Sequence, residues 1–278
     1  FLSYNPTPVS VGLLQDSGKV SFTLKGGEAL LCFDNSENCI QKIGTNRTFS
    51  FAPESANSCV FMEIFENQKD RQVGFSGSCN ASIRPISTDT IIHLPYKARS
   101  YRNGRVDFRT ALNGKIHTTF TTRLNVYLKG ISQMPESWPA EALKAQVVVA
   151  RSFTGRKLLE SGDETSMSQQ TKEACFCNLL DNISDQIFRG WTGEISHPNW
   201  VKAVDETSRK VLGYHGKIVL GMFSSSSGGY TESYDEIYGN DDHPYLVTVR
   251  DSASFSESAA NPHEIWKASY GQKILTAT

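Results

Sequence analysis

The 278-residue sequence lacks several features that would place it in a familiar class. It has little net charge, because 28 Lys and Arg residues set against 29 Asp and Glu residues give −1, so the basic footprint of a nucleic-acid-binding protein is missing. No apolar run approaches the roughly 18 residues of a membrane-spanning helix. Position 1 is Phe1 rather than Met. We therefore expect that a signal peptide or anchor was removed, or that the chain was trimmed.

What is present is ordinary for a globular protein. The chain is 38% hydrophobic and 21% charged, and its length suits one large domain or two small ones. The six cysteines are an even number, which is compatible with disulfides in an oxidising compartment. The simplest pairing joins Cys32 to Cys39 and Cys59 to Cys79, although four cysteines allow three connectivities. The Cys175-Phe-Cys177 pair is too close for a relaxed bridge, so free thiols or pairing with another cysteine are equally open.

The first 95 residues have the pattern of β-strands. Apolar and polar residues alternate at 9–13, 20–24 and 48–51, with turn signals between these runs. Two further strands are expected at 101–109 and 115–128, and Asn103-Gly104 and Asn113-Gly114 are dipeptides typical of hairpin turns. The sequence thus predicts an α+β fold, with an antiparallel β-rich region at 1–95 and a core at 96–278 that mixes helix and sheet around a substrate groove.

A helical run follows the loop at 130–138, in which proline prevents helix formation. Pro135 and Pro139 lack N–H groups and bias the residues before them to extended conformations. Good helix formers begin at Glu141, so a helix is predicted over 139–160, with Ser137 as its N-cap. Its apolar residues recur at helical spacing, at Leu143, Val147, Ala150 and Phe153. Arg151 lies among them and needs a partner, which could be a salt bridge or a ligand.

This stretch resembles the signature of a known family. Tyr127-Leu-Lys-Gly130, Met134-Pro-Glu-Ser-Trp-Pro-Ala-Glu-Ala-Leu-Lys-Ala-Gln146 and Ala150-Arg-Ser are similar to the motif of the SpoIID (stage II sporulation protein D) family. Members of that family are bacterial lytic transglycosylases of peptidoglycan, with the amidase-enhancer proteins as relatives. The similarity extends over about 96–251, with a weak echo at 9–13. It includes a helix expected at 197–208, a hairpin at 211–220 and a strand at 245–251. The resemblance implies the SpoIID fold, a location in the periplasm or cell envelope, and cleavage of glycan strands. The family tends to act on strands stripped of stem peptides.

One position departs from the family pattern. A lytic transglycosylase needs a carboxyl group that first protonates the glycosidic oxygen and then takes the proton of the muramic C6 hydroxyl, which leaves 1,6-anhydro-muramic acid ends. The family places a catalytic Glu immediately before the Met-Pro, and this chain has Gln133 there. An engineered Glu→Gln change and a natural non-catalytic branch are both open explanations. Glu136 is the alternative acid, whereas Glu141 fits the first helical turn.

The resemblance implies a groove between the 130–138 loop and the 224–232 turn. Gln133 would hold the catalytic position in it. The substrate-binding residues would be Met134, Glu136, Trp138, Lys144, Gln186, Ser225, Ser226, Ser227, Gly228, Gly229, Tyr230 and Thr231. The expected partners are peptidoglycan glycan strands, with other cell-wall hydrolases as further candidates and no nucleic acid. No cofactor is expected.

Other chemistries have weaker support. The serines at 224–227 do not form a G-x-S-x-G elbow, and the histidines show no triad spacing, which disfavours a serine hydrolase. Cys175 and Cys177 have no nearby His that would complete a zinc site, so no metal is expected. The rival to the enzyme is a non-catalytic peptidoglycan-binding or amidase-enhancing module. A structural or adhesive protein would need neither Gln133 nor an open groove.

Overall fold

The computed structural model describes residues 8–33, 39–55, 58–64, 71–77, 79–111, 113–162, 166–224, 226–240 and 242–255. The chain forms two compact units, Phe1–Leu212 and Gly213–Thr278. Helices and mixed sheets occur together, which confirms the predicted α+β class. Among the described residues, no helix combines the length and apolar character that crossing a bilayer requires.

The first unit contains two β-sheets. The seven-stranded sheet has the order β13-β1-β12-β11-β8-β3-β4 and the six-stranded sheet the order β10-β9-β2-β5-β6-β7. The first is built from β1 (Val9–Ser17), β3 (Ala29–Phe33), β4 (Cys39–Ile43), β8 (Ala81–Pro85), β11 (Gly104–Thr110), β12 (Ile116–Thr122) and β13 (Leu179–Leu180). The second is built from β2 (Val20–Lys25), β5 (Arg47–Ser55), β6 (Ser58–Ile64), β7 (Arg71–Gly77), β9 (Ile91–Leu94) and β10 (Arg99–Tyr101). Neighbouring strands run antiparallel except β1 and β13, which are parallel.

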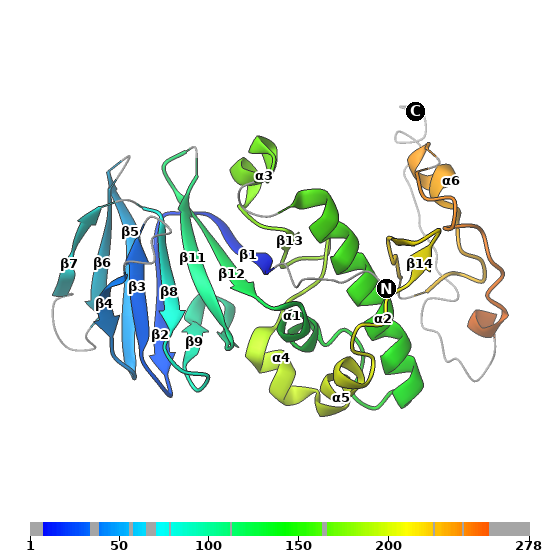
Figure 1. Ribbon diagram of the computed structural model, residues 1–278, viewed down its shortest axis with the longest axis horizontal. Helices are drawn as coiled ribbons and strands as arrows, with labels where there is room; N and C mark the ends of the chain where they lie inside the picture. The colour runs from blue at the N-terminus through cyan, green and yellow to red at the C-terminus, as the bar shows by residue number, and fades with distance from the viewer. Residues whose placement is uncertain are drawn as a thin grey trace, which may run out of the picture. The chain divides into compact units, whose positions relative to one another are not determined.

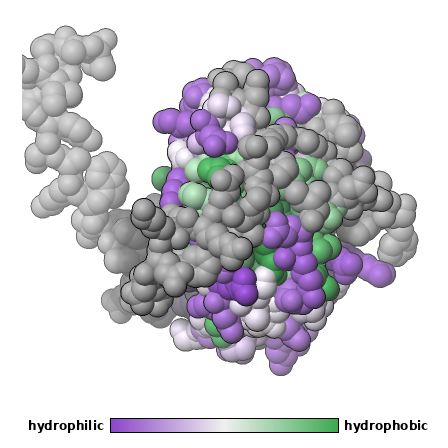
Figure 2. All heavy atoms as spheres, turned by 90° about the vertical axis from the view of Figure 1, so that its left-hand side faces the viewer, coloured by the Kyte–Doolittle hydropathy of each residue, from purple (hydrophilic) through white to green (hydrophobic). Residues whose placement is uncertain are grey.

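Phenylalanine rings join the two sheets into a sandwich. Phe108 of the seven-stranded sheet lies 4.7 Å from Phe51 and 6.2 Å from Phe22, both on the six-stranded sheet. All three side chains are fully buried, because alternate residues of each strand face the same side and the apolar sides turn toward one another. Figure 2 views the molecule from the side of β7, and the coloured part of this face has hydrophilic side chains around apolar patches. The alternating pattern in the sequence therefore marks the sandwich core.

Two disulfides cross-link the strand region as the sequence predicted. Cys32 bonds to Cys39 between β3 and β4, and Cys59 of β6 bonds to Cys79. The expectation for the last pair was wrong, because Cys175 and Cys177 bond to each other across the single residue Phe176. Neither of their thiols is free. The turn at Phe176 has a φ of 51°, which brings the two flanking side chains to the same side.

Helices cover the other end of the first unit (Figure 1). They are α1 (Leu124–Ile131), α2 (Ala140–Ser161), α3 (Gln169–Ala174), α4 (Gly190–Ser196) and α5 (Pro198–Glu206), with a short 3₁₀ helix, η1, at Pro95–Lys97. The predicted helices at 139–160 and 197–208 are confirmed as α2 and α5. The N-cap of α2 is Pro139 rather than Ser137, because residues 135–138 form a separate turn in which the Trp138 N–H donates to the Pro135 carbonyl at 3.1 Å.

Two details of the predicted strands were wrong. The strand expected at 115–128 ends at Thr122, and α1 follows it. Leu124, Tyr127, Leu128 and Ile131 have helical spacing, which prevailed over the short alternation at 124–128. Asn113-Gly114 does lie in the turn between β11 and β12, but Asn103-Gly104 carries the chain from one sheet to the other. The division at residue 95 stays a prediction, and the seven-stranded sheet takes strands from both sides of it.

The second unit is smaller and has little regular structure. Its β14 (Gly213–Tyr214) and β15 (Lys217–Ile218) form the predicted hairpin, followed by α6 (Tyr234–Tyr238) and a 3₁₀ helix, η2, at Ser252–Phe255. The strand expected at 245–251 is present only as an isolated antiparallel bridge between Tyr230 and Arg250. Backbone hydrogen bonds from Thr231 to Val249 and from Asp251 to Gly229 extend this pairing.

Candidate functional site

The connection between α1 and α2 carries the family motif. α1 ends at Ile131, and its C-cap Ser132 is a buried residue whose left-handed φ of 31° turns the chain away from the helix axis. Gly130, the next-to-last residue of α1, lies so close to the start of α4 that an added Cβ would be 2.5 Å from the Phe188 ring and 3.0 Å from the Gly190 Cα. Only glycine fits there. The close approach fixes the direction in which the 132–139 loop leaves the helix.

Gln133 is held against α2. Its Oε1 accepts a hydrogen bond from Nε2 of Gln146 at 3.0 Å, and both side chains are half-buried. The next residue, Met134, packs against the hydrophobic core. The position that the family gives to a catalytic acid is therefore structured, and it holds an amide. An amide can bind a sugar hydroxyl but cannot supply a proton of useful acidity.

Glu136 holds the loop to α5. Its carboxylate accepts the backbone N–H groups of Asn199 and Trp200, in the first turn of that helix, and its carbonyl accepts from Nδ2 of Asn199 at 3.2 Å. A carboxylate at a helix N-terminus satisfies free N–H groups and is favoured by the helix dipole. Trp200 in turn donates from Nε1 to the Leu128 carbonyl at 2.8 Å. Glu136 thus links α1, the loop and α5, and this observed role differs from that of a catalytic acid.

Two further motif residues lie near the surface. Lys144 pairs with Glu141 at 2.8 Å and with Glu206 at 2.9 Å, and these hydrogen bonds, that with Glu141 first, raise the pKa of Lys144 above its ordinary value. Trp138 is 45% exposed, so its ring is accessible to a ligand. A flat aromatic face next to polar groups is a surface on which sugars stack. Both assignments to substrate binding stay predictions.

Gln186 is in the core rather than in a groove. It is 1% exposed, and its Oε1 accepts from the Tyr127 hydroxyl at 2.8 Å and from the Thr154 hydroxyl at 3.1 Å. Burial raises the pKa of Tyr127, so the phenol stays protonated and donates. In this structure Gln186 orders α1 against α2 and has no surface from which to contact glycan, which corrects the expected groove position.

Arg151 is explained by neither of the partners that the sequence suggested. Its guanidinium donates to the backbone carbonyls of Val204, Thr207 and Lys210, at 3.1, 2.7 and 3.0 Å. These carbonyls lie at and just beyond the C-terminus of α5, where the helix dipole favours a cation. Burial lowers the pKa of Arg151 to about 10, which still leaves it charged at neutral pH. Arg151 therefore caps α5 from the middle of α2.

Residues 112–214 match the family model described as SpoIID, stage II sporulation protein. The chain carries a SpoIID domain. The match confirms the resemblance seen in the motif. The chain is 34% identical over 127 residues to the amidase enhancer of Bacillus subtilis (strain 168), an alignment that covers 45% of this chain and 15% of that protein.

Two proteins named stage II sporulation protein D are also similar. That of Bacillus amyloliquefaciens is 30% identical over 148 residues, 48% of this chain and 40% of the relative. That of Bacillus subtilis (strain 168) is 31% identical over 139 residues, 46% of this chain and 38% of the relative. The chain thus spans less than half the length of each of these relatives.

Within the SpoIID domain, Glu194 is an acid that the motif did not indicate. Burial is the main cause of a raised pKa at Glu194, partly offset by the charges of Lys129 and Arg102. Its neighbour Gly193 lies against the α1–α2 connection, since a Cβ there would be 2.8 Å from the Ser132 Oγ. A carboxyl with a raised pKa suits a general acid. No sequence pattern marks it, because the raised pKa depends on packing between α1 and α4.

The serine and glycine segment lies in the second unit. Ser227 donates to Oδ2 of Asp251 at 2.8 Å and accepts from the Gly229 N–H at 3.2 Å. Gly228 and Gly229 have φ of 65° and 100°, so they form a turn that other residues would strain. Ser226, Tyr230 and Thr231 flank it, whereas Ser225 lies outside the described residues. Each unit is described by itself, so the groove between this turn and the SpoIID loop stays a prediction.

Proposed function

We propose that the chain binds peptidoglycan glycan strands outside the cytoplasm, in a site of the lytic-transglycosylase type whose acid position holds Gln133. The observation that supports this is the Gln133–Gln146 hydrogen bond, in a loop whose other motif residues are present and ordered. Gln is nearly isosteric with Glu, so contacts to the glycan survive while proton transfer fails. The chain as given therefore binds strands with little or no turnover.

The neighbouring acid does not replace the missing one in this proposal. Glu136 accepts two backbone N–H groups of α5, and using it as an acid would uncap that helix. The accessible Trp138 ring, in the same loop as Gln133, supplies a stacking face. Glycan strands stripped of stem peptides are the preferred substrate in this proposal, and other cell-wall hydrolases are candidate partners.

A second function is a non-catalytic module that binds peptidoglycan or enhances an amidase. The amide at position 133 favours it, and one relative bears the name amidase enhancer. Such a module would need the binding surface and no acid. Restoring the acid separates the two functions, because only a latent transglycosylase site gains activity.

The test is the Gln133→Glu variant. We expect it to release products with 1,6-anhydro-muramic acid ends at least about 10²-fold faster than the chain as given, since general acid–base catalysis contributes roughly 10²–10⁴-fold. Partial burial next to Met134 would raise the pKa of the new carboxyl, and the Gln146 amide can rotate so that its oxygen accepts the acid proton. Products from intact and stem-stripped peptidoglycan are measured by mass spectrometry.

Gln146→Glu is the matched control. It places a carboxylate on α2 at the hydrogen-bonding neighbour of Gln133, so it tests whether any acid next to position 133 is sufficient. We expect it to stay inactive. A Gln133→Glu variant that binds both substrates and cleaves neither would reject the transglycosylase site and leave the binding module. Failure of every form to bind glycan would reject both functions.

A further inference from the structure

The disulfide between Cys175 and Cys177 lies between a short helix and an edge strand. α3 ends at Ala174, and β13 begins at Leu179. The disulfide spans the single residue Phe176, and its two cysteines are buried, at 5% and 2% exposed. A disulfide stabilises a protein chiefly by constraining the unfolded chain, and the effect grows with the length of the closed loop. A disulfide across one residue therefore adds little to global stability, and its effect is local.

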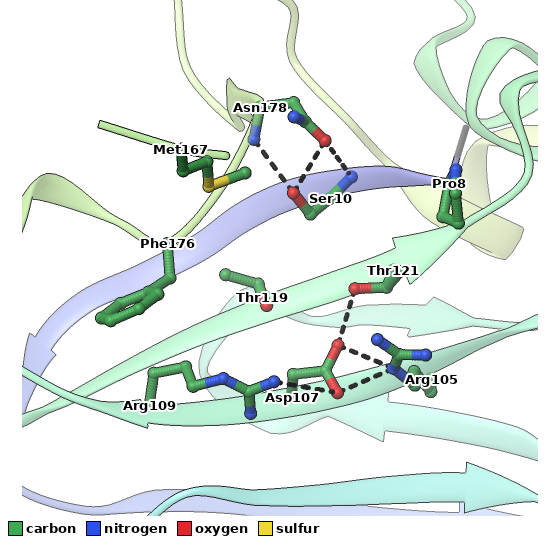
Figure 3. A pocket seen from close by; sticks show the side chains of 10 residues that line it. All are labelled: Pro8, Ser10, Arg105, Asp107, Arg109, Thr119, Thr121, Met167, Phe176 and Asn178. Carbon is green, nitrogen blue, oxygen red and sulfur yellow. Dashed lines mark hydrogen bonds and ion pairs between the residues drawn. The ribbon is translucent and has the colours of Figure 1, made fainter. Parts of the chain in front are cut away.

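The chain after this disulfide is firmly held to the seven-stranded sheet. Figure 3 shows Asn178 bound to Ser10 of β1, whose N–H and hydroxyl donate to the Asn178 Oδ1 at 2.9 and 2.8 Å. The Asn178 N–H donates back to the Ser10 hydroxyl at 3.0 Å. The side chain of Asn178 also donates from Nδ2 to the Ser161 hydroxyl at 2.8 Å and to the Gly162 carbonyl at 2.9 Å. This side of the disulfide is therefore fixed to both β1 and the end of α2.

The chain before the disulfide is held by fewer contacts. α3 has six residues, and none of them is buried. Within the described part of the chain, the one hydrogen bond that ties α3 to the sheets runs from Nε2 of His117 to the Glu173 carbonyl, at 3.0 Å. A helix this short is not stable by itself in water. Its position therefore depends on the residues at its two ends.

Phe176 connects the end of α3 to the disulfide. The N–H groups of Cys175 and Phe176 both donate to the Thr171 carbonyl, at 3.0 and 3.1 Å. Phe176 has a left-handed φ of 51°, which a large side chain rarely adopts and which persists only where the surroundings enforce it. The disulfide enforces it, because it joins the residues on either side. Breaking the disulfide lets Phe176 relax to a negative φ, and its N–H then leaves the Thr171 carbonyl.

The Phe176 ring covers part of the seven-stranded sheet. Together with Met167, which precedes α3, it lines a cavity of about 160 Å³ whose other wall includes Arg105 and Asp107 of β11 (Figure 3). The ring also lies 6.3 Å from the ring of His117 on β12. Movement of α3 and Phe176 would therefore expose this side of the sheet to solvent.

We propose that the Cys175–Cys177 disulfide is a redox-controlled latch: a dithiol reduces it, and the segment from α3 to Phe176 then leaves the sheet. One thiolate of the dithiol attacks a sulfur of the latch and forms a mixed disulfide, which releases the other cysteine as a thiolate. The second thiol of the dithiol displaces the first cysteine, so that both cysteines end as thiols and the dithiol as a cyclic disulfide. Two electrons and two protons thus pass from the dithiol to the latch.

Access to the buried sulfurs comes from local opening of α3. A helix without buried residues opens at a small free-energy cost, and each opening brings the latch to solvent. Once the latch is reduced, the open form is no longer opposed by the constraint at Phe176. This device lies on the sheet and does not depend on the glycan function proposed above.

The test is limited proteolysis of the intact chain with trypsin, with and without dithiothreitol. Cleavage after Lys172 of α3 reports opening of the latch, and cleavage after Lys157 of α2 reports global unfolding. We expect reduction to speed cleavage after Lys172 at least about tenfold and to leave cleavage after Lys157 unchanged, since cleavage follows the population of the open form. Unchanged cleavage after Lys172 in the reduced chain, or equal acceleration at both sites, overturns the proposal.

The order of reduction is a second measurement on the same chain. Thiols are trapped with iodoacetamide at increasing dithiothreitol concentration and located by mass spectrometry. Cys175 and Cys177 should be modified at concentrations that leave the Cys59–Cys79 disulfide intact, because that disulfide joins residues 20 positions apart and constrains a longer loop. Opening of Cys59–Cys79 before the latch overturns the proposal.

A double variant removes the latch without a reductant. In Cys175→Ala with Cys177→Ala, trypsin should cleave after Lys172 at the reduced rate whether or not dithiothreitol is present. Cys32→Ala with Cys39→Ala is the matched control, because it removes the β3–β4 disulfide and should keep Lys172 protected until dithiothreitol is added. A folded latch variant in which Lys172 stays protected overturns the proposal. If that variant does not fold, the two measurements on the unmodified chain decide.

Discussion

The sandwich and the helical layer of the first unit are stabilised by different kinds of buried contact. In the sandwich, aromatic rings such as Phe51 and Phe108 meet between sheets with no polar partner to satisfy. In the helical layer, Gln186 accepts from Tyr127 and Thr154, and Arg151 caps the end of α5. Apolar burial is non-directional, whereas each buried polar group needs a particular partner. The helical layer, which carries the family motif, is therefore the part where single polar changes should matter most.

The largest expected effect tests the apolar contacts of the sandwich. Phe108→Ala removes a fully buried ring from the contact between the sheets, so we expect a loss of about 3–5 kcal/mol in the free energy of unfolding. Urea unfolding followed by circular dichroism measures it. Trp138→Ala, at a 45% exposed ring, is the control and should cost much less. Equal losses in the two variants would contradict a sandwich stabilised chiefly by its buried rings.

The second largest effect tests the buried polar contacts of the helical layer. Arg151→Met keeps much of the side-chain volume but leaves the last carbonyls of α5 without their donor, and we expect a loss of about 2–3 kcal/mol. Arg156→Met on the same helix is the matched control. Arg156 pairs with Glu160 one turn along the surface, a contact worth about 0.3–0.5 kcal/mol. If both substitutions cost the same in urea unfolding, the contrast between buried and surface polar contacts fails.

The smallest effect is a dependence on pH. Burial raises the pKa of Glu194 above its ordinary value of 4.5, so the folded chain binds more protons than the unfolded chain between 4.5 and the raised value. Protonated Glu194 favours the folded state, and this stabilisation is lost as pH rises through that window. Glu194→Gln should stabilise the protein at neutral pH, and the gain should disappear below pH 4.5. Melting curves across pH measure it, with the exposed Glu160→Gln as control. A gain that persists unchanged in acid would show that the charge is not its cause.

Much of this organisation could be predicted from local pattern. Alternation placed β1, β2 and β5, helix propensity placed α2, and the motif placed Gln133 in the loop before it. The simplest pairing that the sequence offered, Cys32–Cys39 and Cys59–Cys79, is also confirmed. One error came from an ambiguous pattern. Residues 124–128 fit both a strand and a helix, and the helical spacing that continues to Ile131 prevailed.

The sequence by itself determined the α+β class, the SpoIID motif and the amide at the acid position, because each depends on residue identity or short-range periodicity. Only the tertiary structure decided that Gln186 is buried, that Glu136 caps α5 and that Arg151 binds carbonyls rather than a carboxylate. It also brought Arg105 and Phe176, 71 positions apart, to one cavity. The physical reason is that hydrogen bonding and burial depend on partners far along the chain, and no local pattern encodes which partners will meet.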